Sequence, residues 1–233
     1  MSDTPLAPDK ARFAEFLVRS GALGFGSFTT AAGRPSPYFI NSGRIASGAL
    51  LAELAGFYAR TLRGALGGAF EVLFGPAYKG IPLAAATAIE LHRECGQDVA
   101  ICFDRKEVKD HGEGGSLVGH APRDGDRVVI VEDVVSAGGS VRRSAARLRA
   151  AAAVEIVGLV VSVDRMERGQ GERSALEELR DELHVPTFPI VTIAEVMGHL
   201  EGRAVDGRVV LDAEAAGRVR DYLRQYGPRP APW

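Results

Sequence analysis

The segment that decides the fold is Val128-Val129-Ile130-Val131-Glu132-Asp133-Val134-Val135-Ser136-Ala137-Gly138-Gly139-Ser140. Its run of apolar β-branched residues predicts a buried central strand of a parallel sheet. The small residues after it predict a turn, and Val141 to Leu148 is typical of a helix. A strand, a glycine-containing turn and a helix N-terminus predict an anion-binding site, because unpaired backbone N–H groups and the helix dipole both favour negative charge.

Two adjacent carboxylates, Glu132 and Asp133, are expected where this strand ends. A phosphate alone would not explain them. They suit a ligand that carries a phosphate and vicinal hydroxyls, or a reaction in which positive charge develops nearby. A ribose 5-phosphate that reacts at C1 through an oxocarbenium-like state meets both demands. The alternative is an ordinary strand–turn–helix unit whose acids cap the helix, but the combination of acid pair, loop and helix favours the ribose phosphate.

The composition indicates one α/β domain with room for a small appendage, since the chain has 233 residues and 46% hydrophobic content. A formal net charge of −2 argues against a general nucleic-acid or anionic-membrane surface. No apolar run is as long as a membrane span, and the start does not resemble a signal peptide, so the cytoplasm is expected. Cys95 and Cys102 are too few for a metal site and are expected to be buried free thiols.

The N-terminal part predicts a helix followed by short strands. Apolar residues recur at helical spacing between Asp9 and Arg19, which predicts an amphipathic helix that packs on the domain or on a partner subunit. Turn residues dominate from Gly21 to Gly48 and favour short strands and loops. Residues 36–41 are a candidate floor for a flat ring, and a small hydrophobic cluster is an equal alternative.

Downstream, helical and strand-like segments alternate, as in a parallel α/β sheet. Besides the central unit, helices are predicted at 49–66, 81–94, 174–183, 194–200 and 213–226, and strands at 71–74, 99–103, 154–163 and 188–193. The tail, 227–233, is expected to fray.

Three positions outside the central unit carry candidate cationic groups. Lys79 lies in a tight strand–loop–helix connection, Gly75 to Gly80, where a lysine can neutralise a phosphate oxygen; a solvated surface lysine is the alternative. Residues 105–116 combine cations with glycines and predict a mobile basic loop, which beside a polyphosphate site can close as a lid and exclude water. Arg165 directly follows the predicted strand 154–163, at the sheet edge where parallel α/β folds bind ligands.

These stretches resemble the bacterial type of orotate phosphoribosyltransferase, a branch of the type I phosphoribosyltransferases. Residues 128–140 are similar to the ribose-phosphate signature of the whole group, and residues 33–39, 74–80, 105–115 and 164–169 are similar to the orotate branch. The resemblance implies the type I fold: α/β, with a central, mostly parallel sheet flanked by helices. It also implies a single domain with an N-terminal hood of helix and short strands (about 1–48) and a mobile lid loop (about 105–116).

The resemblance also implies the reaction. Orotate and 5-phosphoribosyl 1-diphosphate (PRPP) give orotidine 5′-monophosphate and diphosphate, a step of de novo pyrimidine synthesis. Mg²⁺ is expected, held mainly by the diphosphate and ribose oxygens of PRPP rather than by a protein cage. The expected assembly is a homodimer in which the lid, through Lys106, serves the neighbouring subunit.

Site residues carry over from the resemblance position by position. The implied PRPP-binding residues are Tyr78, Lys79, Arg105, Lys106, Lys109, His111, Glu132, Asp133, Val134, Val135, Ser136, Ala137, Gly138, Gly139 and Ser140. The implied orotate-binding residues are Phe39, Ile40, Ser136 and Arg165. Arg165 can pair with the orotate carboxylate, and Phe39 can stack on the ring. The expected catalytic residues are Glu132 and Asp133, which offset positive charge, and Lys109, which neutralises the leaving group.

Several positions depart from the pattern of that family. Glu132 stands where Asp is usual, and Ser136 replaces Thr but keeps the hydroxyl. Gly139 replaces a Thr that helps to hold the phosphate, while Ser140 follows where Ala is usual and is expected to take over part of that role. Ala31 replaces a PRPP-contacting lysine, so diphosphate binding must depend more on Lys79 and the lid, or on Arg34.

Two other functions remain open at this point. A PRPP-sensing regulator without catalysis would usually add a DNA-binding element or lose the lid, and this sequence shows neither change. A purine phosphoribosyltransferase is the second, and Arg165 and the stretch 36–40 argue against it.

Overall fold

The computed structural model of the chain describes residues 5–30, 33–109 and 115–230, apart from the side chains of 106–109 and 115. Its helices are α1 (Pro8–Arg19), α2 (Gly48–Leu66), α3 (Gly80–Cys95), α4 (Gly139–Ala151), α5 (Ala175–Leu183), α6 (Ile193–Leu200) and α7 (Ala213–Tyr226). Its strands are β1 (Leu23–Thr29), β2 (Pro35–Ile40), β3 (Val72–Gly75), β4 (Ala100–Lys109), β5 (Gly115–Gly119), β6 (Arg127–Val134), β7 (Glu155–Asp164), β8 (Thr187–Thr192), β9 (Ala204–Val205) and β10 (Arg208–Val209).

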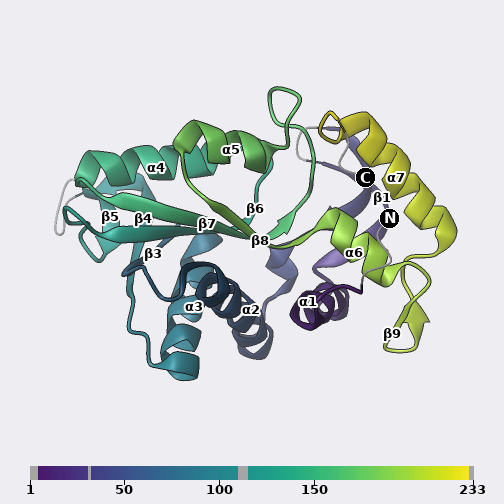
Figure 1. Ribbon diagram of the computed structural model, residues 1–233, viewed down its shortest axis with the longest axis horizontal. Helices are drawn as coiled ribbons and strands as arrows, with labels where there is room; N and C mark the ends of the chain where they lie inside the picture. Colours follow the sequence, from purple (N-terminus) through teal and green to yellow (C-terminus); the bar gives the residue numbers. More distant parts are fainter. Residues whose placement is uncertain (1–4, 31–32, 110–114, 231–233) are drawn as a thin grey trace.

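A six-stranded sheet in the order β5-β4-β3-β6-β7-β8 forms the centre of the molecule (Figure 1). The neighbours from β4 to β8 are parallel, and only the β4–β5 pair of this sheet is antiparallel. This confirms the predicted α/β architecture with a mostly parallel sheet. Strands β3 and β6 are neighbours although α3, β4 and β5 separate them in sequence. Their C-terminal ends therefore lie together where the strand order reverses, which is where open α/β sheets bind ligands.

Helices cover both faces of this sheet. Figure 1 shows α4 and α5 on one face, with α2 and α3 on the other. Side chains alternate along β6 to match: Val128 and Ile130 pack in the cluster with α4 and α5, whereas Val129 and Val131 pack in the cluster with α1, α2 and α3. All four are fully buried, and burial of each such side chain contributes about 1.5–3 kcal/mol. The central strand is thus fixed by contacts on both faces.

The hood consists of α1, the antiparallel β1–β2 hairpin and the short turn η1 (Ser42–Arg44). The predicted amphipathic helix is confirmed, and its apolar face packs on the domain itself. Phe13 and Phe16 are fully buried, and the Phe13 ring centroid lies 4.9 Å from that of Phe57 on α2. This contact attaches the hood to the main sheet layer.

Local capping signals set the helix boundaries. At the start of α2, Ser47 accepts a hydrogen bond from the N–H of Leu50, and Gly67 ends this helix in a left-handed conformation. Ser174 and Thr192 form capping boxes at α5 and α6. Because such signals lie within a few residues of each boundary, the predicted helices match the observed ones closely.

The predicted loop 105–116 is wrong at both ends, because residues 105–109 belong to β4 and residues 115–116 to β5. β4 continues to Lys109 and pairs with β5, so that Asp104 lies opposite Leu117 and Lys109 opposite Gly115. Antiparallel pairing gives these backbone groups hydrogen-bond partners and overrides the polar, glycine-rich composition. Residues 110–114 lie outside the described part, so the predicted lid is described only at its two ends.

The predicted frayed tail is wrong as far as Pro230. Gly227 and Pro228 are buried, and the N–H of Arg229 donates to the carbonyl of Glu172 at 2.7 Å. Residues 231–233 lie outside the described part. The short β9–β10 hairpin was not predicted, because two-residue strands leave no periodic pattern.

The remaining sequence expectations concern thiols and membrane spans. Cys102 is buried and Cys95 half-buried, both as free thiols, and burial raises the pKa of Cys102 to about 11. Over the described ranges, none of the helices has the length and apolar character needed to cross a membrane.

Candidate functional site

Glu132 and Asp133 were expected where the central strand ends, but both lie within β6, which continues past them to Val134. Neighbouring residues of a strand point to opposite faces of the sheet. Glu132 accordingly faces the α4 side and Asp133 the hood side. Both are buried, with 7% and 6% of their surface exposed. Although adjacent in sequence, the two carboxylates have different partners.

Asp133 is held by two donors. Its Oδ2 accepts a hydrogen bond from Lys79 Nζ at 2.8 Å and from the Ser42 hydroxyl at 2.6 Å. Burial alone would raise the pKa of Asp133, but the hydrogen bonds from Lys79 and Ser42 outweigh it and lower the pKa. Asp133 therefore stays charged at neutral pH. The Ser162 hydroxyl fixes the backbone by donating to the Asp133 carbonyl at 2.6 Å.

Glu132 has weaker support. Its Oε2 accepts from the Ser140 hydroxyl at 2.9 Å, and its Oε1 accepts from the N–H of Asp133 at 3.1 Å. The buried Tyr58 hydroxyl donates to the Glu132 carbonyl at 2.8 Å. Burial, together with the charge on Asp133, raises the pKa of Glu132 to about 7. The two carboxylates thus differ in charge near neutral pH, although they are consecutive residues.

The predicted strand–turn–helix connection is present between β6 and α4. Gly138 has φ of 73°, and a Cβ there would lie 2.9 Å from the Leu179 side chain, so both conformation and space require glycine. α4 begins at Gly139 with no side-chain cap. Its first N–H groups therefore have no intrahelical partner and can bind an anion.

Side chains around this loop limit the roles of several predicted residues. Val134 and Val135 pack into the two apolar clusters, so only their backbone groups can reach a ligand. The Ser140 hydroxyl supports Glu132 rather than lying free for a phosphate. Arg142 holds the loop from behind, donating from Nη1 to the Ala137 carbonyl at 2.5 Å while its Nε contacts Glu182.

The neighbouring loop, Pro76 to Lys79, joins β3 to α3 and is closely packed at both ends. A Cβ on Gly75 would lie 2.3 Å from the Gly80 carbonyl oxygen, and a Cβ on Gly80 would lie 2.8 Å from the Val131 carbonyl oxygen. Only glycine fits this approach to β6. The loop brings Lys79 to Asp133 and leaves Tyr78 64% exposed.

The lid candidates are only partly described. Arg105 lies on β4, half-buried, and its carbonyl accepts a hydrogen bond from Arg147 at 3.3 Å. The side chains of Lys106 and Lys109, and the whole of His111, lie outside the described residues. Their predicted roles stay predictions.

The two hairpin residues expected to bind orotate point in opposite directions. Phe39 is 39% exposed and stacks on Phe28 with ring centroids 5.5 Å apart. Ile40, its neighbour on β2, is 7% exposed and belongs to the core. Because a strand alternates its side chains, Phe39 can offer a ring face to a ligand, whereas Ile40 can offer only backbone.

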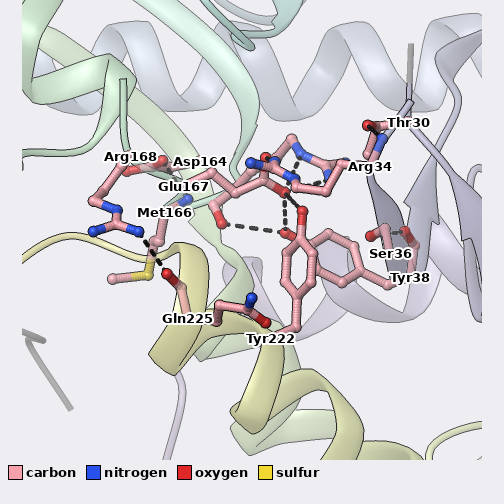
Figure 2. A network of polar contacts seen from close by, with 11 residues as sticks. Thr30, Arg34, Ser36, Tyr38, Asp164, Met166, Glu167, Arg168, Tyr222 and Gln225 are labelled. Atoms are coloured by element: carbon pink, nitrogen blue, oxygen red, sulfur yellow. Dashed lines mark hydrogen bonds and ion pairs between the residues drawn. The ribbon is translucent and has the colours of Figure 1, made fainter. Parts of the chain in front are cut away.

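Arg165 belongs to a polar network that joins the loop after β7, the β1–β2 hairpin and α7. Figure 2 shows the residues of this network around Glu167. Glu167 is at its centre. Its Oε1 accepts from Arg165 Nε at 3.0 Å and Nη2 at 2.5 Å, from the Tyr222 hydroxyl at 2.8 Å and from the Tyr38 hydroxyl at 3.1 Å. Arg34 binds the other oxygen. This Glu167 network therefore holds two guanidinium groups on one carboxylate.

The network carries one net positive charge. Burial alone would raise the pKa of Glu167, but the charge and hydrogen bonds of Arg165, with smaller effects from Tyr222 and Arg34, lower the pKa and keep it ionised. Arg165 is 9% exposed and lies over the Tyr38 ring at 4.6 Å. Arg34 lies over Tyr226 at 4.5 Å, and its Nε is buried with no partner in the described part of the chain. Within the described residues, the Arg34 side chain thus contacts Glu167, Tyr222 and Tyr226, and not Lys79.

Several residues of the site were not identified from the sequence. Ser42 of the hood and Ser162 of β7 bind Asp133, and Tyr58 of α2 binds Glu132. Asp104 and Arg147 support the Pro76–Lys79 loop, and Glu167 supports the loop after β7. Glu167 lies within the family-like stretch 164–169, but no role was predicted for it. The other contacts join residues 27 to 91 positions apart, and no short pattern reports such pairs.

The carboxylates do not form a metal cage by themselves. Within the ranges that the structure describes, no group of three or more His, Cys, Asp or Glu side chains is placed to hold a metal ion.

The site geometry agrees with the similarity of this chain to known proteins. The model of the phosphoribosyl transferase domain family matches residues 43–188. The orotate phosphoribosyltransferase of Lachnoclostridium phytofermentans is 49% identical over 218 residues, 94% of this chain and 97% of that protein. That of Nitrosococcus oceani is 48% identical over 92% of this chain and 94% of its own length. The crystal structure of the Francisella tularensis orotate phosphoribosyltransferase matches with a TM-score of 0.78 and 32% identity, covering 93% of this chain and 99% of that one.

These relatives match nearly the whole chain. Its curled six-stranded sheet with flanking helices is the type I phosphoribosyltransferase fold, in agreement with the match to the solved structure. The loop between β6 and the uncapped N-terminus of α4, the two carboxylates beside it and the Glu167 network after β7 lie within that shared fold. The chain therefore belongs to the orotate phosphoribosyltransferase family of pentosyltransferases.

Proposed function

We propose that this chain transfers the 5-phosphoribosyl group of PRPP to N1 of orotate, using a donor side and an acceptor side. The donor side consists of the loops Pro76–Lys79 and Ser136–Ser140 with Glu132 and Asp133. The acceptor side consists of Phe39 and the Glu167 network. The observation that carries the proposal is the meeting of the β3 and β6 loops, where Lys79 lies 2.8 Å from Asp133 beside an uncapped helix N-terminus.

On the donor side, the backbone N–H groups of residues 137–140 hold the 5′-phosphate. Asp133 and Glu132 bind ribose hydroxyls and offset the positive charge that develops at C1 as the diphosphate leaves. Lys79, which already neutralises Asp133, lies where it can exchange that contact for a diphosphate oxygen. Tyr78 and Arg105, and the lid residues Lys106, Lys109 and His111, are assigned to the diphosphate from the resemblance alone.

Magnesium fits this arrangement as a companion of PRPP. The two carboxylates are hard oxygen donors that lie beside the ribose position, which suits a substrate that brings Mg²⁺ on its own oxygens. When bound, the metal supplies charge neutralisation for the diphosphate. The protein contributes Lys79 and Asp133 next to that position.

On the acceptor side, the single net charge of the Glu167 network matches the single carboxylate of orotate. Arg165 can add a charge-assisted hydrogen bond to that carboxylate while Glu167 keeps the guanidinium in place. Phe39 offers a partly exposed ring for stacking on the pyrimidine. The hydroxyl of Ser136, in the exposed part of the β6–α4 loop, completes the assignment.

A substrate panel tests the proposal. The purified chain is given PRPP and Mg²⁺ with orotate, uracil, hypoxanthine or adenine, and nucleotide formation is followed. Orotidine 5′-monophosphate should form far faster than the other products. Turnover of a purine base would identify a purine enzyme, and PRPP binding without any turnover would identify a regulator; either result contradicts the proposal.

The proposed assembly is a homodimer in which Lys106 of the lid serves the neighbouring subunit. In such a dimer each site combines one body with the other subunit's lid. An equimolar mix of Asp133→Asn and Lys106→Ala subunits should then recover about a quarter of wild-type activity, because half the dimers are mixed and each holds one intact site of two. If Lys106 acted within its own subunit, the mix would stay inactive after exchange confirmed by mass. The cytoplasmic location stays a prediction.

A further inference from the structure

We propose that Asp104, held in place by Arg147, positions the Pro76–Lys79 loop and thereby sets the affinity for the diphosphate group of PRPP. This inference rests on the proposed function. Neither residue belongs to the stretches that indicated the family, and neither needs to touch the substrate.

The Asp104 carboxylate joins three elements. It lies on β4 with 9% of its surface exposed. Its Oδ1 accepts a hydrogen bond from the backbone N–H of Ala77 at 2.7 Å, in the β3–α3 loop. Its Oδ2 pairs with Arg147 Nη1 of α4, and the same nitrogen donates to the Arg105 carbonyl at 3.3 Å.

The loop needs such support at its centre. Gly75 and Gly80 fix its two ends by close backbone contact, and the N–H of Gly80 donates to the Pro76 carbonyl at 2.9 Å. Between these ends, the N–H of Ala77 is bound by the carboxylate of Asp104. A charged acceptor makes this hydrogen bond stronger than a neutral one. Because Lys79 lies two residues further on, Asp104 also controls where the Lys79 side chain begins.

The position of Asp104 connects the loop to the base of the lid. Asp104 and Leu117 form the last regular β4–β5 pair before the register shift that ends at Lys109 and Gly115. Arg147 comes from α4, the helix whose N-terminus forms the other wall of the donor side. One partly buried ion pair therefore links the loop of Lys79, the start of the lid segment and α4, the helix proposed to bind the phosphate.

A purely structural ion pair would stabilise the fold without favouring either substrate, so the test compares the two KM values. The variants are Asp104→Ala, Asp104→Asn and Arg147→Met. Arg220→Met is the matched control, because Arg220 also pairs with one carboxylate, that of Glu201, and its side chain is 33% exposed, as is that of Arg147. Steady-state KM for PRPP and for orotate is measured with each protein, along with its melting temperature.

Asp104→Ala should raise the KM for PRPP about tenfold, the size expected for loss of a charged hydrogen bond that positions a binding group. The KM for orotate should change less than about twofold, within the error of such comparisons. Asp104→Asn should have a smaller effect than Asp104→Ala, because its amide oxygen can still accept from Ala77. Adding Arg147→Met to Asp104→Ala should cause no further rise, since the two residues act as one unit.

Equal changes in both KM values, or values that match those of Arg220→Met, would overturn the proposal. If Asp104→Ala does not fold, the nearly isosteric Asp104→Asn and the partner variant Arg147→Met decide by the same comparison. Failure of the proposed function is separate, because the unmodified protein would then not form orotidine 5′-monophosphate at all.

Discussion

The donor side and the acceptor side of this site are built in different ways. The donor side forms at the ends of two adjacent strands, β3 and β6. Their loops are fixed by close backbone contacts at Gly75 and Gly80 and by the left-handed conformation of Gly138. The acceptor side forms where side chains from the hairpin, the loop after β7 and α7 meet on one carboxylate, Glu167 (Figure 2).

The two sides therefore differ in what holds their functional groups in position. On the donor side the backbone is held by the sheet and by its glycines, with Asp104 as added support for the Pro76–Lys79 loop. Substitution of a reacting group such as Asp133 therefore removes that group without moving the backbone. On the acceptor side, position depends on hydrogen bonds between side chains, and loss of one partner leaves the others unpaired in a buried place. We expect donor-side changes to act on PRPP binding and on the rate of transfer, and acceptor-side changes to act mainly on the choice of base.

The largest effect is expected at Asp133. Asp133→Asn is nearly isosteric but removes the charge that Lys79 and Ser42 keep in place. Loss of one well-placed electrostatic group should lower kcat by on the order of 10²–10³. Steady-state kinetics at saturating substrates measure this. The control is Asp221→Asn, an exposed carboxylate paired with Arg224, which should keep its activity. A kcat within a few-fold of the unmodified enzyme would remove Asp133 from the mechanism.

An intermediate effect is expected at Arg165. Arg165→Gln should raise the KM for orotate by about ten- to a hundredfold, the equivalent of a lost hydrogen bond between charged groups. The KM for PRPP should stay nearly constant. Arg168→Gln serves as control, because Arg168 lies three residues away and donates to the Gln225 carbonyl instead. A rise confined to the KM for PRPP would contradict the separation of the two sides.

The smallest effect is expected in the pH dependence. The pKa of Glu132 is about 7, raised by burial and by the charge on Asp133, so Glu132 loses its negative charge as the pH falls through that value. The value of kcat/KM for PRPP should therefore decline on the acid side with a midpoint near pH 7. The hydrogen bond from Ser140 favours the charged form, so Ser140→Ala should raise the pKa of Glu132 and move this acid limb to higher pH.

A matched control exists four residues along the same helix. Ser144 is buried, and its hydroxyl has no hydrogen-bond partner within the described residues. Ser144→Ala should leave the acid limb of the pH profile where it is. The same profile for Ser140→Ala and Ser144→Ala would show that Ser140 does not act on Glu132.

The two sides also differ in how far the sequence could predict them. The donor side lies in contiguous stretches, because a strand, its loop and the next helix are consecutive, and the central strand, the uncapped helix start and Lys79 were predicted there. The opposite orientations of Glu132 and Asp133 could have been predicted from strand alternation, had β6 been extended to Val134.

The acceptor side was predicted only as single residues. Arg165 was identified from its place after a strand, and its partner Glu167 lies only two residues away. Glu167 in turn is held by Arg34, 133 residues before it, and by Tyr222, 55 residues after it. The adjacent pair Phe39 and Ile40 was assigned one role, whereas the β2 pleat separates them. Contacts of this kind arise from tertiary packing, which local periodicity does not encode.

The most direct test of the division into a donor side and an acceptor side compares two nucleotides that differ only in the orotate carboxylate. The dissociation constants of orotidine 5′-monophosphate and uridine 5′-monophosphate are measured by calorimetry. The proteins are the unmodified enzyme and the variants Arg165→Gln and Lys79→Met. The unmodified enzyme should prefer orotidine 5′-monophosphate by about tenfold or more, the worth of one charged hydrogen bond. Arg165→Gln should lose this preference, and Lys79→Met should keep it, because neither nucleotide carries a diphosphate. A preference that survives in Arg165→Gln, or that disappears in Lys79→Met, would contradict the account.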